Sequence, residues 1–219
     1  MKATEMLRDR FVSEQIEARG VRDPLVLAAM RTVPREQFVP EYLSHAAYED
    51  SPLPIGAGQT ISQPYIVAFM VEALLLRGGE KVLEIGAGSG YAAAVLAQIA
   101  SQVFTIERIG QLAEMATANV AVAGCRNVHV RHADGTEGWA DEAPFDAILV
   151  SAGAPDVPNS LMQQLTLGGR LVVPVGRNRH VQELVRIIRI EKDEFDREDL
   201  AGVRFVPLIG KEGWESEEA

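Results

Sequence analysis

The sequence predicts an α/β fold in which a mostly parallel sheet carries helices on both faces. Short apolar segments alternate with amphipathic segments over residues 61–176, which is the order expected of repeated strand–helix units. A glycine-rich turn, Gly86-Ala87-Gly88-Ser89-Gly90, joins one apolar segment to the helical segment that follows it. A chain of 219 residues with 47% hydrophobic side chains is long and apolar enough for one domain with a substantial core.

The first sixty residues predict a helical extension to that domain. Residues 4–19 place apolar side chains along one side of a helix. Asp23 followed by proline is typical of an N-cap, so a second helix is expected over 25–31. Residues 51–60 contain two prolines and two glycines and predict a loop. We expect the extension, residues 1–60, to pack over the sheet edge or over the ligand site.

The central part predicts the sheet itself. A helix over 62–76 comes first, and two glycines end it. Five strands are expected after it, at 81–85, 102–107, 127–132, 145–150 and 169–175. Helices are expected between the strands, at 90–100, 110–123 and 157–165.

The last part predicts an antiparallel strand pair and an acidic tail. Strands are expected at 182–190 and 203–208, on either side of a charged turn at 192–199. We expect the tail, 211–219, to be frayed apart from Trp214. The prediction is thus a single domain, 1–219, made of the extension at 1–60, the ligand-binding core at 61–176 and the C-terminal elements at 177–219.

Composition and charge narrow the class of protein. The chain has 31 acidic and 21 basic side chains, a net charge of -10, which disfavours a nucleic-acid partner because phosphate binding needs a basic surface. Its single cysteine, Cys125, cannot form an internal disulfide and suits a reducing compartment. No signal-peptide pattern and no apolar run of membrane-spanning length is found. We expect a cytoplasmic protein, most simply a monomer, with no membrane or nucleic-acid partner; its four histidines are scattered, so no metal site is expected.

The spacing of the glycine-rich turn selects among ligands. A dinucleotide fingerprint would place its third glycine at position 91, where this chain has Tyr91. Glu84, in the preceding strand, would repel a pyrophosphate but could pair with an ammonium group. The pattern Glu84-x-Gly86-x-Gly88-x-Gly90 resembles motif I of the S-adenosylmethionine-dependent methyltransferases, and this resemblance implies a Rossmann-like sheet that binds S-adenosyl-L-methionine. A plain strand–helix turn without a ligand is the alternative.

Two further acidic positions lie where parallel strands end. Glu107 ends the second strand, where an acid in nucleotide-binding folds accepts hydrogen bonds from ribose hydroxyls. A solvated strand-end carboxylate is the alternative. Asp134-Gly135 follows the third strand, where a loop carboxylate could accept the amine of an adenine; a simple turn-forming pair is the alternative. The carboxyl ends of these strands meet at one edge of the sheet, so the three acidic side chains are expected around one ligand.

Several segments, taken in chain order, resemble the protein-L-isoaspartate (D-aspartate) O-methyltransferase family. The resemblance covers about residues 5 to 214 and includes stretches outside the generic methyltransferase core. Those stretches are Val21–Pro24, Val33–Pro40, Tyr48–Asp50, Gly58–Pro64 and Val203–Leu208. Gln63 and Tyr65 stand where relatives often carry alanine and histidine.

The resemblance implies methyl transfer from S-adenosyl-L-methionine to the α-carboxylate of isoaspartyl residues in age-damaged proteins and peptides. S-adenosyl-L-homocysteine would be the product, and the ester would collapse to a succinimide. Ser62 carries over as the active-site serine, contacting the substrate carboxylate, although a helix N-cap is an equal alternative. Val206, Pro207 and Leu208 match the substrate edge. The cofactor contacts implied are Gln59, Thr60, Ile61, Ser62, Glu84, Gly86, Ala87, Gly88, Gly90, Glu107, Arg108, Asp134, Gly135, Ile209 and Trp214.

Three other functions compete with this interpretation. A methyltransferase acting on a small molecule would share the core but would not need the segments at 33–40 and 58–64. A cofactor-binding regulatory protein without turnover would share the whole fold. A dehydrogenase is disfavoured by Tyr91.

Overall fold

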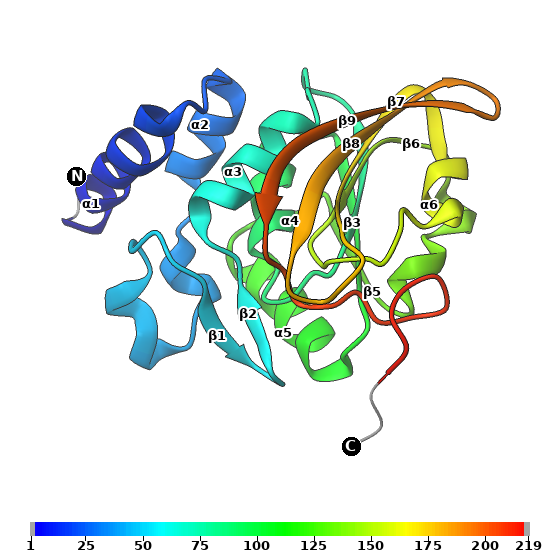
Figure 1. The fold of residues 1–219 in the computed structure, drawn as a ribbon. Helices are drawn as coiled ribbons and strands as arrows, with labels where there is room; N and C mark the ends of the chain where they lie inside the picture. Colours follow the sequence, from blue (N-terminus) through cyan, green and yellow to red (C-terminus); the bar gives the residue numbers. More distant parts are fainter. Residues whose placement is uncertain (1–2, 217–219) are drawn as a thin grey trace.

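A twisted seven-stranded sheet forms the centre of the molecule in the computed structural model, which describes residues 3–216 (Figure 1). From one edge to the other, its strands are β5 (Val128–His132), β4 (Gln102–Glu107), β3 (Lys81–Ile85), β6 (Phe145–Val150), β7 (Leu165–Val175), β8 (Gln182–Glu191) and β9 (Glu194–Val203). The first five are parallel to one another, whereas β8 is antiparallel to both β7 and β9. The predicted α/β class and the closing antiparallel pair are both confirmed.

Helices cover both faces of this sheet. One face packs under α3 (Pro64–Ala73), α4 (Tyr91–Ala97) and α5 (Gly110–Val122), and the other under α6 (Asn159–Gln163) and two short 3₁₀ turns, Gly135–Glu137 and Ala140–Glu142. Alternate strand residues supply the two cores: Val82 belongs to the first and Leu83 to the second, and both are fully buried. Because both faces of the sheet are buried, the sequences of its central strands are almost entirely apolar.

The N-terminal extension packs against the helical layer. It comprises α1 (Ala3–Phe11), a π turn (Val12–Ile16), a 3₁₀ turn (Glu17–Arg19), α2 (Pro24–Thr32) and 3₁₀ turns at Arg35–Phe38 and Glu41–Ala46. Asp23 caps α2 as expected, accepting from the backbone N–H groups of Leu25 and Val26. Phe38 lies edge-on to Tyr91, their ring centres 5.6 Å apart. The extension therefore packs on the helices that cover the sheet, and the prediction that it packs over the sheet edge is wrong.

A two-stranded hairpin replaces the predicted loop at 51–60. Its strands are β1 (Leu53–Gly56) and β2 (Gln59–Ile61), and Ala57 and Gly58 form the turn with φ of +50° and +69°. Leu53 and Ile55 alternate with exposed residues and are buried. This two-residue period is too short, and too interrupted by proline, to be recognised in the sequence.

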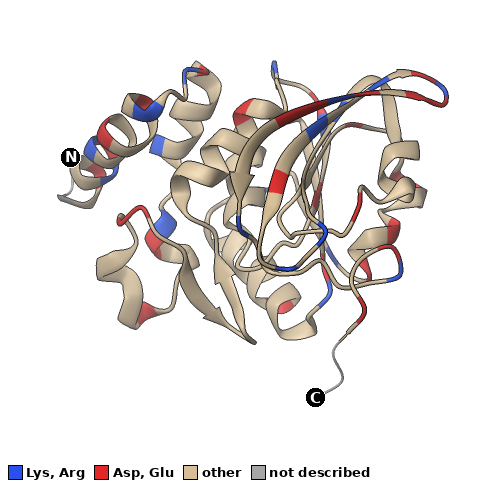
Figure 2. Ribbon diagram, viewed as in Figure 1, with Lys and Arg blue, Asp and Glu red and all other residues tan. Residues whose placement is uncertain are grey.

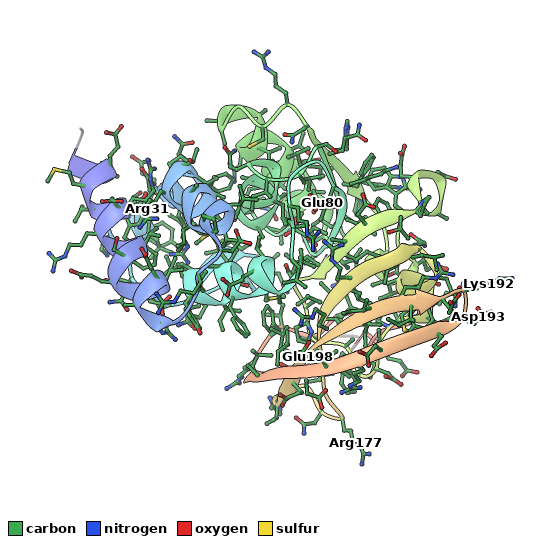
Figure 3. All side chains as sticks on the ribbon, turned by 90° about the horizontal axis from the view of Figure 1, so that it is seen from above. Arg31, Glu80, Arg177, Lys192, Asp193 and Glu198 are labelled. Carbon is green, nitrogen blue, oxygen red and sulfur yellow. The ribbon has the colours of Figure 1, made fainter. Side chains whose placement is uncertain are left out.

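The charged stretch after residue 192 is a strand and not a turn. Only Lys192 and Asp193 turn the chain, at the far tip of the β8–β9 hairpin (Figure 3). β9 is an edge strand with solvent on its outer side, so acidic and basic side chains along it cost little. Of the strand predicted at 203–208, Val203 is the last residue of β9, and 204–208 is an extended segment with a single bridge, from Pro207 to Gly153.

The C-terminal segment 211–216 is tied to the body of the protein. The backbone N–H of Lys211 donates to Asp134 Oδ2 at 2.9 Å, and that of Trp214 donates to the Leu208 carbonyl at 2.7 Å. The prediction of a frayed tail is therefore wrong up to residue 216, and its last part, 217–219, lies outside the described residues. Within residues 3–216, no helix combines the length and apolarity that crossing a membrane requires.

Candidate active site

Two adjoining cavities open at the carboxyl ends of β3, β4 and β6. Both are lined by Thr60, Gly86, Gly88 and Ser151, so they form one continuous hollow under the β1–β2 hairpin. A ligand-binding crevice is expected at this edge of an open parallel sheet.

The glycine-rich turn forms the floor of the hollow. Gly86 and Gly88 have φ of +91° and +55°, backbone angles that residues with a Cβ rarely adopt. A Cβ on Gly88 would also lie 3.2 Å from Ile55 Cδ1 of the hairpin. The Gly86 and Ala87 N–H groups donate to the Ile106 carbonyl, which anchors the turn to β4.

Glu84 is the fully buried acid beneath this turn. Thr105 Oγ1 donates to its Oε2 at 2.6 Å, whereas Oε1 has no hydrogen-bond partner within the described residues. Burial raises the pKa of Glu84 to about 8; the nearby Glu107 also raises it and the Thr105 hydrogen bond lowers it. A buried, unpartnered acceptor that lines a cavity calls for a donor from a ligand.

Glu107 is the last residue of β4, and its carboxylate lines the second cavity. Its Oε2 accepts from the Gly88 N–H and its Oε1 from the Ile109 N–H, each at 2.9 Å. Each carboxylate oxygen can accept a further bond, so these contacts orient the side chain without exhausting it. The alternative of a solvated strand-end carboxylate is wrong, because Glu107 is only 7% exposed.

Ser62 lies at the mouth of the first cavity. Its carbonyl accepts from the buried guanidinium of Arg35 at 3.2 Å, while its hydroxyl has no hydrogen-bond partner in the described part of the chain. The N-cap alternative is wrong: Gln63 occupies that position without a side-chain cap. Asp50 Oδ1 accepts the Tyr65 N–H instead.

Gln63 and Tyr65, which differ from the residues common in the family, contact Asp50 and its ion-pair partner Arg19. Gln63 Nε2 donates to Asp50 Oδ2 at 2.7 Å, and the Arg19 guanidinium lies 3.6 Å from the centre of the Tyr65 ring. Arg19 in turn forms an ion pair with Asp50. Gln63 and Tyr65 therefore belong to the cluster that fastens the start of α3 to the extension.

Most of the predicted site residues line the hollow, and three do not. Gly90 packs against α5, where a Cβ would lie 3.0 Å from Val120 Cγ1. Both oxygens of Asp134 already bind inside the protein: Oδ1 to Thr136 and Oδ2 to Lys211. Trp214 lies behind the wall, donating from Nε1 to the Gly153 carbonyl. The residues that do line it are Gln59, Thr60, Ile61, Ser62, Glu84, Gly86, Ala87, Gly88, Glu107, Arg108, Gly135, Val206, Pro207, Leu208 and Ile209.

Several residues that line the hollow were not predicted from the sequence. Ser151 and Ala152 follow the end of β6 directly, and that position in a parallel sheet was the signal that could have identified them. Val67, Met70 and Ile109 line the hollow from helices or loops and had no such signal. Among residues 3–216, no group of histidine, cysteine, aspartate and glutamate side chains is arranged to hold a metal ion.

Comparison with known proteins identifies the family. The family model described as protein-L-isoaspartate(D-aspartate) O-methyltransferase matches residues 6–213. The chain belongs to this family. It is 66% identical over 209 residues to protein-L-isoaspartate O-methyltransferase 1 of Rhodopseudomonas palustris, covering 95% of this chain and 85% of the relative. It is 55% identical over 214 residues to protein-L-isoaspartate O-methyltransferase 2 of Pelobacter propionicus, covering 98% and 95%.

Solved structures agree with the family and the fold. One described as a protein-L-isoaspartate O-methyltransferase superposes with a TM-score of 0.85 at 30% identity, covering 94% of this chain and 67% of its own. Another, described as a protein-L-isoaspartate O-methyltransferase from Plasmodium falciparum in complex with S-adenosyl-L-homocysteine, superposes with a TM-score of 0.81 at 25% identity. That match covers 92% of this chain and 98% of the other. The chain is therefore a methyltransferase that shares the fold of these family members.

Proposed function

We propose that this protein transfers a methyl group from S-adenosyl-L-methionine to the α-carboxylate of L-isoaspartyl residues in damaged proteins and peptides. The observation that carries the proposal is one continuous hollow that joins the glycine-rich turn to Ser62 and to the segment 206–208. The family match over residues 6–213 supports it, because this match extends far beyond the methyltransferase core. The same match disfavours a small-molecule acceptor.

The hollow fits the cofactor chemically. The unpartnered Oε1 of buried Glu84 would accept from the cofactor's ammonium group, and Glu107 would accept from its ribose hydroxyls. The other proposed contacts are Gln59, Thr60, Ile61, Ser62, Gly86, Ala87, Gly88, Gly90, Arg108, Asp134, Gly135, Ile209 and Trp214. Gly90, Asp134 and Trp214 would act by shaping the walls, since they do not line the hollow. The relative from Plasmodium falciparum binds S-adenosyl-L-homocysteine, which supports this assignment.

The main task of the protein in this reaction is to align the methyl group of the cofactor with the acceptor carboxylate. S-adenosyl-L-methionine supplies an electrophilic methyl group, and a peptide carboxylate is already ionised at pH 7, so no general base is needed. The Ser62 hydroxyl would hydrogen-bond and orient the acceptor carboxylate. The extended segment at 206–208 would lie along the peptide as a strand edge. Closing the hollow over the reactants would keep water away from them.

We also propose that the protein is a monomer in the cytoplasm, with no nucleic-acid or membrane partner. Both edge strands carry charged side chains, which oppose edge-to-edge pairing and support a monomer. A net charge of -10 disfavours nucleic acid as a partner. The single cysteine, which is buried, supports a reducing cytoplasm. We retain one domain over 1–219 as part of this proposal.

The test is methyl transfer from labelled S-adenosyl-L-methionine to a matched pair of peptides. One carries isoaspartate and the other carries normal aspartate at the same position. We expect base-labile label on the isoaspartyl peptide alone. Label on neither peptide, with S-adenosyl-L-homocysteine still binding, would rule out this acceptor while leaving the cofactor assignment standing.

A further inference from the structure

A broad groove leads away from the proposed active site across the open end of β8 and β9. It shares Thr60, Ser62 and Ser151 with the first cavity. Its far wall is made by the loop that precedes β8 and by the segment that follows β9. A peptide whose reactive carboxylate lies at Ser62 would therefore continue into this groove.

The charge of the groove is opposite to that of the molecule. Its charged lining residues are Arg179 and Arg204, and within the described chain no aspartate or glutamate lines it. Figure 2 shows basic residues where β9 ends and in the loop before β8, whereas the charged residues of β9 itself are mostly acidic. With a net charge of -10, the protein repels acidic peptides over much of its surface but not here.

A buried glutamine holds the two basic walls together. Gln182 is 2% exposed; its Nε2 donates to the Arg179 carbonyl at 3.0 Å and its Oε1 accepts the Phe205 N–H at 2.8 Å. Its side chain thus links the loop that carries Arg179 to the segment that carries Arg204. A Cβ on Gly153 would lie 2.9 Å from Gln182 Cδ, so the glutamine has little room to move.

The basic side chains differ in how firmly they are held. Arg179 lies over the Trp214 ring, 5.5 Å from its centre, and donates to the Glu215 carbonyl at 2.8 Å. Arg204 is exposed, and Arg177 projects outward from the same loop (Figure 3). Glu183 is the carboxylate next along β8, and it lies outside the groove lining.

We propose that this groove recognises acidic side chains near the isoaspartyl residue, so that peptides with acidic flanks are the preferred substrates. The inference rests on the proposed function and adds a substrate class to it. Opposite charges across a rim mainly steer the encounter and set specificity. The preference should therefore appear in kcat/KM and weaken as salt is added.

The experiment uses three isoaspartyl peptides that differ only at two flanking positions, which are Glu, Gln or Lys. We expect kcat/KM at low ionic strength to fall in the order Glu, Gln, Lys, by roughly two- to fivefold per step, the range for exposed charge pairs. The spread should shrink at 0.5 M salt. Equal values for the three peptides would overturn the inference and leave the proposed function intact, whereas no methylation of any of them would overturn the proposed function.

Two matched variants locate the preference. Arg204→Gln removes a charge from the groove, and Arg197→Gln removes one from β9, outside the groove. We expect Arg204→Gln to reduce the Glu-to-Lys ratio of kcat/KM by roughly two- to fivefold, and Arg197→Gln to retain the wild-type ratio. Equal reductions in the two variants would assign the effect to net charge and overturn the role of the groove.

Discussion

Glu84 shows how one residue can link the fold, the cofactor and pH. It is the next-to-last residue of β3, between Thr105 of β4 and Leu149 of β6, and its side chain is fully buried. Its pKa of about 8 means that the ligand-free protein holds it mainly as the neutral acid at pH 7. To accept an ammonium group, the carboxyl must first release its proton.

We therefore predict that S-adenosyl-L-homocysteine binds more tightly as the pH rises from 6 to 8. Each pH unit below the pKa weakens binding by up to about 1.4 kcal/mol, the free energy of one unit of pKa. Calorimetric titration across this range measures the effect. Glu84→Gln should bind more weakly and with a flatter profile, and a flat wild-type profile would contradict the ammonium assignment.

The same side chain makes the ligand-free protein less stable as the pH rises. Between pH 4.5 and about 8, the unfolded chain has lost the Glu84 proton that the folded chain keeps, so the free energy of unfolding falls. We predict a smaller fall for Glu84→Gln over this window. Urea unfolding of both proteins at pH 5, 6.5 and 8 provides the comparison, and parallel curves would argue against a raised pKa.

Ser62 illustrates a residue whose hydroxyl and backbone have different tasks. Arg35 holds its carbonyl, and the helix that follows is capped by Asp50, so the hydroxyl carries no structural bond. We predict that Ser62→Ala lowers kcat on an isoaspartyl peptide roughly 10- to 100-fold, the loss of one hydrogen bond to a charged group. The melting temperature and the affinity for S-adenosyl-L-homocysteine should stay near wild type. A variant that melts earlier yet turns over normally would refute this role.

Among the secondary elements, the C-terminal segment and the β1–β2 hairpin close the site from opposite sides. The segment returns from the end of β9 and bonds to the loop after β5 through Asp134 and Thr136. The hairpin contributes Gln59, Thr60 and Ile61 to the opposite wall. Neither element belongs to the parallel sheet, yet both line or support the hollow that the sheet opens.

Trp214 tests how firmly the C-terminal segment is held. Trp214→Ala removes a partly buried ring and leaves the Gly153 carbonyl without the indole donor. We predict a loss of about 2 kcal/mol in the free energy of unfolding, together with weaker cofactor binding because Ile209 and the neighbouring wall loosen. Tyr42→Ala is the control, since Tyr42 is 70% exposed and should cost less than about 0.5 kcal/mol. Equal effects of the two substitutions would contradict a docked segment.

For the molecule as a whole, the two edges of the sheet decide whether chains associate. β9 presents Glu194, Asp196, Arg197, Glu198 and Asp199, and β5 presents Arg131 and two histidines. Charged edges oppose pairing with a second sheet. Neither sheet edge therefore offers an apolar surface on which a second chain could pair.

We predict that the protein sediments as a single chain at micromolar concentration. Asp196→Val combined with Glu198→Val should promote association. The unpaired backbone N–H and C=O groups of the edge strand would then be flanked by apolar side chains and no longer by these two charges. Analytical ultracentrifugation at matched concentrations separates the outcomes. A wild-type dimer would show that some other surface is used and that edge charge does not control assembly.

Much of the core of the fold was predictable because its signals are local. Five strands, the glycine-rich turn and the capping by Asp23 each depend on residues within a few positions of one another, where apolar period and turn chemistry operate. The lining positions of Glu84 and Glu107 followed from the rule that ligands bind at the carboxyl ends of parallel strands. Family membership was likewise visible in the order of short segments.

Contacts between distant segments were decided only by the tertiary structure. Asp134 was predicted to face an adenine, but it does not line the hollow; its carboxylate accepts from Thr136 and from Lys211, which lies 77 positions further along the chain. The buried Arg35 joins carbonyls of Ala47, Ser51 and Ser62, and no local pattern marks it. Periodicity reports which face of an element is buried and not what covers it, so the closed site and the basic groove emerge only once the elements are packed.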